Sequence, residues 1–232
     1  MAETIPIFPL ATVLLPGTSL PLHIFEPRYR QLTMDLVKEV WPDKTFGVVC
    51  TKPGWAKADG ELGDITEAGQ LRQVGCAAVL REVKRLPDGR YDIVTTGDRR
   101  FRLLSVDATS APYLLGEVQW LPDSAPPTRT AELLPRLADL ARAAHRRYCD
   151  AAWQHEDWTE PPRDADFAVL GHLVAADCLL ATEDRQRLLE EVCPATRLRT
   201  VRKLLAREAG ILRELHAVPV PLSELRPRGC LN

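Results

Sequence analysis

Apolar and polar residues alternate along much of the first half of the chain, a period that predicts β-strands. A short apolar run at 45–51 is typical of a buried strand, and residues 76–84 alternate between two faces. The Pro87-Asp88-Gly89 tripeptide follows; because proline fixes φ and glycine tolerates a positive φ, it predicts a tight turn. Residues 91–96 would then return as the hairpin partner, and a separate strand is expected at 100–106.

One helix is predicted within this β-rich half, from Pro27 to Val40. Its apolar positions recur at spacings of three and four, at Tyr29, Leu32 (with Thr33), Leu36 and Val40. Proline is well suited to the first helical position because its missing N–H has no helical partner there.

The second half has the spacing of helices. Its first stripe is expected at Leu133, Leu137, Leu140, Ala144 and Tyr148. A second helical segment is predicted at 166–180, and Thr182 is expected to cap a third helix, with Glu183 and Asp184 in its first turn. Pro194 can open the last helix, whose stripe comprises Leu198, Val201, Leu205, Leu212 and Leu215.

Glycine content divides these two halves, because only three of the 13 glycines lie after Gly116. The break falls in a proline-rich stretch at 121–127, which cannot be helical throughout. We therefore predict an α+β chain with a β-rich subdomain at 1–120, a linker at 121–127, a helical bundle at 128–218 and an extended arm at 219–232.

Composition narrows the class of protein. Of the 232 residues, 30 are Lys or Arg and 32 are Asp or Glu, so a net charge of −2 argues against a protein held on nucleic acid mainly by charge. No apolar run reaches the ~18 residues of a membrane span, and the acidic N-terminus is unlike a signal peptide. We expect a cytoplasmic protein without membrane contact. Its six scattered cysteines contain no CxxC pair and are expected to be reduced.

Motifs for catalysis and cofactor binding are missing from the sequence. It has no GxxxxGK[ST], GxGxxG or GxSxG, and Thr159 replaces the second histidine of the HExxH-like string that begins at His155. The histidines and cysteines show no metal-ligand spacing. The prediction is a non-enzymatic protein with no catalytic residue, no metal and no cofactor.

Two basic clusters leave an alternative open. Arg99, Arg100 and Arg102 flank Phe101, and the last helix carries Arg197, Arg199, Arg202, Lys203 and Arg207. Nucleic-acid contact is one interpretation. The other, which the net charge favours, is a solvated face balanced by nearby acids.

The densest signature lies at the N-terminus. It comprises Ile5-Pro6-Ile7-Phe8-Pro9-Leu10, a Pro16-Gly17 turn and the string PLHIFEPRYR at 21–30. Together with Phe46-Gly47-Val48-Val49, the LPDGRYDIV hairpin at 86–94 and Gly97-Asp98-Arg99-Arg100-Phe101-Arg102, this resembles the N-terminal, substrate-binding domain of Lon proteases over about residues 5–215.

The resemblance implies a PUA-like pseudobarrel with one embedded helix, followed by a helical bundle. It also implies a stand-alone domain without the ATPase and peptidase parts, which binds unfolded or tagged protein clients. Such a protein would be an adaptor that presents clients to a protease or chaperone. The alternative is an RNA-binding PUA-like module, which would use Arg99, Arg100 and Arg102. The resemblance fixes neither the clients nor the oligomeric state.

Several matching residues have a structural interpretation. We expect backbone geometry to explain Pro16 and Gly17, and core or helix packing to explain Phe25 and Tyr29. Glu26 and Pro27 would begin the helix, and Arg28 would pair with acids across the fold. For peptide binding, the sequence instead offers tryptophans in expected loops. These candidates are Trp55, Trp153 and Trp158, for which folding back onto the core remains the alternative.

Overall fold

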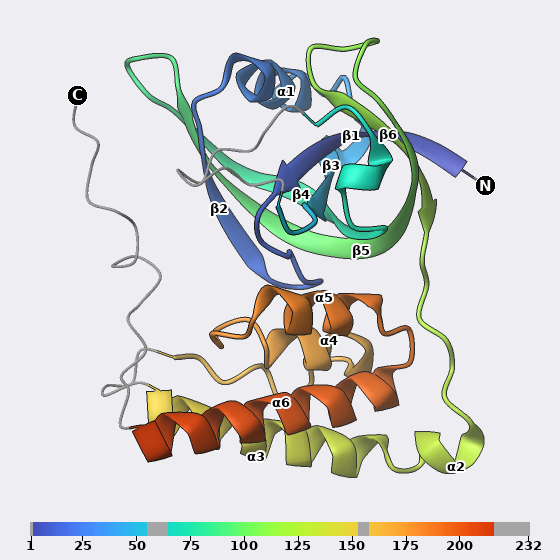
Figure 1. Ribbon diagram of the computed structural model, residues 1–232, viewed down its shortest axis with the longest axis vertical. Coiled ribbons are helices and arrows are strands. Elements are labelled where there is room, and N and C mark those ends of the chain that lie inside the picture. The colour runs from blue at the N-terminus through green and yellow to red at the C-terminus, as the bar shows by residue number, and fades with distance from the viewer. Residues whose placement is uncertain (1, 55–64, 153–157, 216–232) are drawn as a thin grey trace.

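The structure is a computed structural model that describes residues 2–54, 65–152 and 158–215. It places a curved β-sheet above a layer of helices (Figure 1). The sheet is built from β1 (Ala2–Leu10), β2 (Ser19–Ile24), β3 (Thr45–Cys50), β4 (Val74–Arg85), β5 (Tyr91–Asp107) and β6 (Leu114–Trp120). Helix α1 (Pro27–Val37) and the 3₁₀ turns η1 (Pro42–Lys44) and η2 (Ala68–Gln70) lie in its connections. The helical layer contains α2 (Thr128–Ala131), α3 (Leu134–Ala152), α4 (Phe167–Leu173), α5 (Thr182–Glu190) and α6 (Pro194–Leu215).

The sheet closes on itself. Its strand order is β2-β5-β4-β3-β1-β6, and a further pairing between β5 and β6 completes the ring. The first part of β5 pairs with β2, its residues 91–102 pair with β4, and its last residues from Phe101 onward pair with β6. The β1–β3 pairing is parallel and the other pairings are antiparallel. Because β5 has 17 residues, it is long enough to pair with β2, β4 and β6, and the ring therefore closes at this strand.

A small apolar cluster fills the closed sheet around the fully buried Phe101. Glycine is required where strands pass this ring. A Cβ on Gly47 would lie 2.7 Å from Phe101 Cζ, and a Cβ on Gly75 would lie 2.5 Å from the same atom. Both distances are shorter than carbon atoms tolerate, so the ring and the two glycines fit only together.

Helices α3 and α6 run side by side along the far side of the helical layer (Figure 1). The stripe expected on the first of these helices is correct at Ala144 and Tyr148, which are buried, and wrong at Leu133 and Leu140, which are 46% and 37% exposed. The buried face consists mainly of small residues, namely Ala138, Ala141, Ala144, Cys149 and Ala152, together with Arg142, His145 and Tyr148. Small side chains let two helix backbones approach closely, so alanine rather than leucine marks the contact with α6.

Helices α4 and α5 lie between α6 and the sheet (Figure 1). Gln186 of α5 donates from Nε2 to the carbonyl of Val74 on β4 at 3.0 Å. Gly17 meets α4 at its turn: it has φ +78, and a Cβ there would lie 2.7 Å from Val169 Cγ1. The Pro16-Gly17 turn therefore needs glycine both for its backbone angle and for its contact with the helical layer.

A buried charge cluster joins the two layers through the 121–127 segment. The guanidinium groups of Arg100 on β5 and Arg197 on α6 both bond the carboxylate of Asp123. Arg100 also donates to the carbonyls of Leu189 and Glu191 at 2.9 Å. Burial and the neighbouring Arg197 lower the pKa of Arg100. The segment without regular secondary structure is therefore fastened at Asp123 to both layers.

Helix α1 ends three residues earlier than the periodicity predicts. Glu39 adopts φ +58, and the N–H of Val40 donates to the carbonyl of Asp35 at 2.9 Å. The N–H of Glu39 donates to the carbonyl of Leu36 at 3.1 Å. These two bonds form a Schellman turn, in which the left-handed residue stops the helix. Val40 is 61% exposed instead of lying on the buried stripe.

Two further boundaries differ from the prediction. The strands expected at 91–96 and 100–106 form one strand, β5, which passes through Gly97 without a break. This glycine is an internal strand residue because the carbonyl of Leu15 approaches it; a Cβ would lie 2.2 Å from that oxygen. Helix α5 begins at Thr182, so its N-cap is Ala181 and no side chain caps it.

The residues that open α1 behave differently from one another. Tyr29 is buried and stacks on Phe8 at 3.9 Å, and Pro27 occupies the first turn. Phe25 is 51% exposed, which contradicts the expectation of a packed ring. It lies at the bend before α1 and stacks on His23, with ring centroids 6.4 Å apart.

Glu26 is the N-cap residue of α1, but its side chain makes no cap bond, because its carboxylate pairs with the Arg28 guanidinium at 2.8 Å. Arg28 thus pairs locally and not across the fold.

Cysteines within the described residues form no disulfide: Cys50, Cys76, Cys149 and Cys178 are buried thiols and Cys193 is half-buried. None of the helices in this part of the chain is both long and apolar enough to cross a membrane.

Candidate functional site

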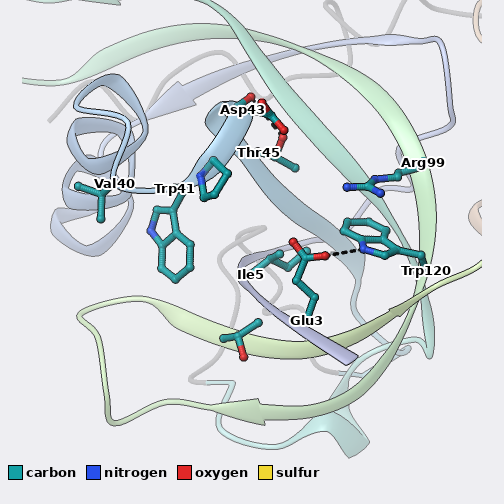
Figure 2. A pocket seen from close by; sticks show the side chains of 10 residues that line it. Glu3, Ile5, Val40, Trp41, Asp43, Thr45, Arg99 and Trp120 are labelled. Carbon is teal, nitrogen blue, oxygen red and sulfur yellow. Dashed lines mark hydrogen bonds between the residues drawn. The ribbon is translucent and has the colours of Figure 1, made fainter. Parts of the chain in front are cut away.

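A pocket of about 300 Å³ opens beside the first residues of β1 (Figure 2). Four segments of the chain form it: the start of β1, the connection from α1 to β3, one residue of β5 and the last residue of β6. The lining residues are Glu3, Thr4, Ile5, Val40, Trp41, Pro42, Asp43, Thr45, Arg99 and Trp120.

The turn after α1 positions the first wall, which is Trp41. The indole Nε1 donates to the hydroxyl of Tyr113 at 2.9 Å, and that hydroxyl donates to Asp35 Oδ2 at 2.8 Å. Burial raises the pKa of Tyr113, so this hydroxyl stays protonated and able to donate. The chain of hydrogen bonds fixes the orientation of the indole from behind.

Trp120, the last residue of β6, forms the opposite wall. Its Nε1 donates to Glu3 Oε2 at 2.6 Å (Figure 2). Its ring meets Phe101 edge to face, with centroids 6.2 Å apart. The guanidinium carbon of Arg99 lies 3.6 Å from the ring centroid. This ring is held at its edge by a carboxylate and on one face by a cation.

The residues that line the pocket suit binding of a ligand side chain and form no recognisable catalytic group. It offers two indoles and the aliphatic side chains of Ile5 and Val40, with the carboxylates of Glu3 and Asp43 at the rim. Within the described ranges, no three His, Cys, Asp or Glu side chains are grouped so as to hold a metal ion. Such walls suit a partly apolar side chain with a polar or charged end.

The tryptophans that the sequence suggested for peptide binding do not line this pocket. Trp55 and Trp153 lie outside the described residues. Trp158 is half-buried and packs edge to face on His145, with ring centroids 5.4 Å apart. Its position on the helical layer separates it from the pocket of the sheet.

The arginines of the first basic cluster have three different environments. Arg100 is 4% exposed and fully engaged in the Asp123 cluster. Arg99 is exposed and lies on Trp120, with Asp98 at 3.8 Å. Arg102 is exposed on β5. The structure therefore does not present the three guanidinium groups as one surface. In the second cluster, Arg197 is completely buried.

Sequence reasoning missed Trp41, Trp120 and Glu3. A signal was available for the tryptophans, because each stands one or two residues before a proline: Trp41-Pro42 and Trp120-Leu121-Pro122. Proline ends regular structure, and a large ring at such an end is placed at a rim and not inside a strand or helix. No sequence signal brought Glu3 to Trp120, since that contact depends on the pairing of β1 with β6.

Comparison with known proteins connects this architecture to one family. Residues 4–207 match the model of the ATP-dependent protease La (LON) substrate-binding domain. The chain is 31% identical to Lon protease of Parabacteroides distasonis over 73% of its length, and 29% identical to Lon protease 1 of Thermus thermophilus over 88%. It spans only 18% and 24% of the length of these two relatives.

Solved structures share the fold. The Lon N-terminal domain protein from Xanthomonas campestris has a TM-score of 0.59 at 24% identity, covering 94% of this chain and 99% of that one. The N-terminal domain of Mycobacterium avium complex Lon protease has a TM-score of 0.62 at 20% identity, covering 88% and 98%. With the family model spanning most of its residues, the chain belongs to the Lon substrate-binding domain family.

Proposed function

We propose that this chain is a non-enzymatic module that binds unfolded segments of client proteins. The observation that carries the proposal is the pocket between Trp41 and Trp120, on a chain whose family is described as substrate-binding. The match concerns that domain and no ATPase or peptidase region. An adaptor role, in which captured clients pass to a protease or chaperone, follows from the relatives being proteases.

The pocket has the features of a peptide-binding site. Large rings at a rim supply contact area at a low cost in side-chain entropy, and tryptophan is enriched among residues that dominate binding energy. Trp41 is already immobilised by Tyr113, and Trp120 is immobilised by Glu3. A preorganised pocket loses less freedom when it binds, which favours capture of flexible chains.

The finer architecture belongs to the same proposal. The closed sheet is consistent with the PUA-like pseudobarrel that the resemblance implies, and α3 to α6 are consistent with a helical bundle. The division into 1–120, 121–127, 128–218 and 219–232 is retained as a working domain map. A cytoplasmic location is part of the same proposal.

The test is binding of a permanently unfolded protein, such as reduced and carboxymethylated α-lactalbumin, measured by fluorescence anisotropy. Trp41→Ala and Trp120→Ala should each weaken binding by about ten-fold or more, the effect of removing a residue that dominates an interface. Val83→Ala is the matched control, because Val83 is an exposed apolar residue on β4 that does not line the pocket.

The same assay tests the other tryptophans. Trp55→Ala, Trp153→Ala and Trp158→Ala measure the second candidate site, which we retain as a proposal. If these variants lose affinity and the pocket variants keep it, the client site lies there and the pocket assignment is wrong. If the native protein binds no unfolded client at micromolar concentrations, the proposed function itself is wrong.

RNA binding remains the alternative from sequence, with less support. The Arg100 guanidinium is buried and bonds Asp123 and two backbone carbonyls, so only Arg99 and Arg102 of that cluster are exposed. An RNA-binding module would lose affinity steeply as salt increases. Salt-sensitive capture of RNA that is abolished by Arg99→Ala with Arg102→Ala would favour this alternative.

A further inference from the structure

Carboxylates and indoles share the rim of the pocket. Of its charged lining residues, Glu3 and Asp43 are acidic and Arg99 is basic. Arg99 has Asp98 beside it at 3.8 Å, so its charge is already partly balanced. The Asp43 carboxylate has no hydrogen-bond or ion-pair partner in the part of the chain that the structure describes. The lining thus has one more acidic than basic side chain, and the Asp43 carboxylate is the one without an ion-pair partner among the described residues.

A cation of the chain itself already lies against one indole of the pocket. The guanidinium of Arg99 lies 3.6 Å above Trp120, and the same indole donates to Glu3 (Figure 2). A cation over an indole face is favoured by the ring quadrupole, most strongly for tryptophan. Trp41 brings a second indole to the pocket, and in the described residues no cation is stacked on it.

We infer that the pocket takes a lysine or arginine side chain from an extended client segment. The aliphatic part of that side chain would lie along Ile5, Val40 and Pro42, and its charged end would reach the Asp43 carboxylate. This inference rests on the proposed function and adds the chemical class of the client segment.

An extended backbone fits the surroundings of the pocket. Ala2 to Pro6 pair with β6 on one side, but the ladder between β1 and β3 begins only at Ile7 and Gly47. On the β3 side, the described strands thus leave the first residues of β1 unpaired. Such a strand end favours a partner in extended conformation, which would place alternate side chains toward the pocket.

Calorimetry with three synthetic peptides tests the inference on the full chain. The peptides share one unstructured apolar sequence and differ at a central position, which is lysine, norleucine or glutamate. Norleucine keeps the aliphatic stem and removes the charge. We expect the lysine peptide to bind about three- to five-fold more tightly than the norleucine peptide, the size of one partly exposed ion pair. The glutamate peptide should bind most weakly.

Asp43→Asn identifies the group responsible. Asparagine keeps the size of the side chain and tolerates the φ of +55 at this position. The variant should lose the preference for lysine over norleucine and bind the norleucine peptide as the native protein does. Asp139→Asn, at an exposed position of α3 outside the pocket, is the charge-matched control and should keep the preference.

The possible outcomes separate the two proposals. Equal binding of the lysine and norleucine peptides overturns the cationic class and leaves the client-binding function standing. A preference that survives Asp43→Asn overturns the assignment to this rim. If no peptide binds and unfolded α-lactalbumin does not bind either, the proposed function fails and this inference fails with it.

Discussion

Replacing Asp123 by asparagine should destabilise the fold more than any single change at an exposed ion pair. The substitution keeps the shape of the side chain and removes the carboxylate shared by Arg100 and Arg197. These two guanidinium groups are 4% and 0% exposed. They would keep their carbonyl acceptors but lose their counter-charge, which comes from an Asp123 side chain that is itself 23% exposed.

The magnitude follows from that burial. Removing one partner of a buried ion pair costs about 3–5 kcal/mol, because the remaining charge is left uncompensated. A domain of this kind has about 5–15 kcal/mol of stability in total, so roughly a fifth or more of it depends on Asp123. Arg100 belongs to the sheet and Arg197 to α6, so the loss should also loosen the contact between the layers.

Urea unfolding followed by far-UV circular dichroism measures this cost. Glu160→Gln is the control, because it breaks the Arg146–Glu160 pair, whose side chains are 48% and 38% exposed. That control should lose less than about 1 kcal/mol. The reasoning is refuted if Asp123→Asn costs no more than the control, or if Asp123→Asn proves more stable than the native chain.

Four further substitutions test other parts of the structure by the same unfolding experiment. Gly75→Ala should lower the free energy of unfolding by about 1–3 kcal/mol, since its Cβ would meet Phe101. Gly210→Ala in α6 is the control: its Cβ would meet nothing within 4 Å, so the free energy of unfolding should rise by about 0.5–1 kcal/mol. Equal effects of the two substitutions would contradict the packing argument. Burial raises the pKa of Tyr29 to about 12, from about 10 in an unfolded chain. The contribution of this protonated hydroxyl to stability is therefore complete below pH 10, and the free energy of unfolding falls by about 2 kcal/mol as the pH rises to 12. Tyr29→Phe should therefore show a shallower alkaline loss than the native protein; an unchanged slope between pH 10 and 12 would exclude this tyrosine as a cause. Glu39→Gly should gain about 0.5–1 kcal/mol by relieving the left-handed residue that ends α1, and a loss of stability would show that the Glu39 side chain compensates.

The sequence predicted the order of strands and helices well where local rules decide it. Pro87-Asp88-Gly89 forms the expected turn, with Gly89 at φ +81, and Pro194 opens the last helix. Turn and cap chemistry depends on neighbouring residues, so it can be deduced from a few letters. The family resemblance rested on such local strings and was confirmed by the family model.

Features that depend on distant contacts could not be predicted in this way. The buried face of α3 is rich in alanine because α6 lies against it. Periodicity alone placed Ala144 and Tyr148 on that face but also placed Leu133 and Leu140 there. Arg100 was interpreted as a surface cation because nothing nearby in sequence shows that Asp123 and two carbonyls surround it. The pocket requires the registers of β1 with β6 and of β5 with β6, which single-sequence patterns do not contain.

The ring of strands is joined by pairings between residues at opposite ends of the β-rich half. Ala2 lies opposite Gln119, and Ile7 lies opposite Leu114. During synthesis, β1 emerges first and β6 last, so the ring cannot close until the whole β-rich half has left the ribosome. Until then, the apolar side of β1 and the glycine-lined interior face solvent, and contacts between such distant residues form slowly. During its own folding, the chain thus passes through a state whose exposed strands resemble the unfolded segments that we propose it binds.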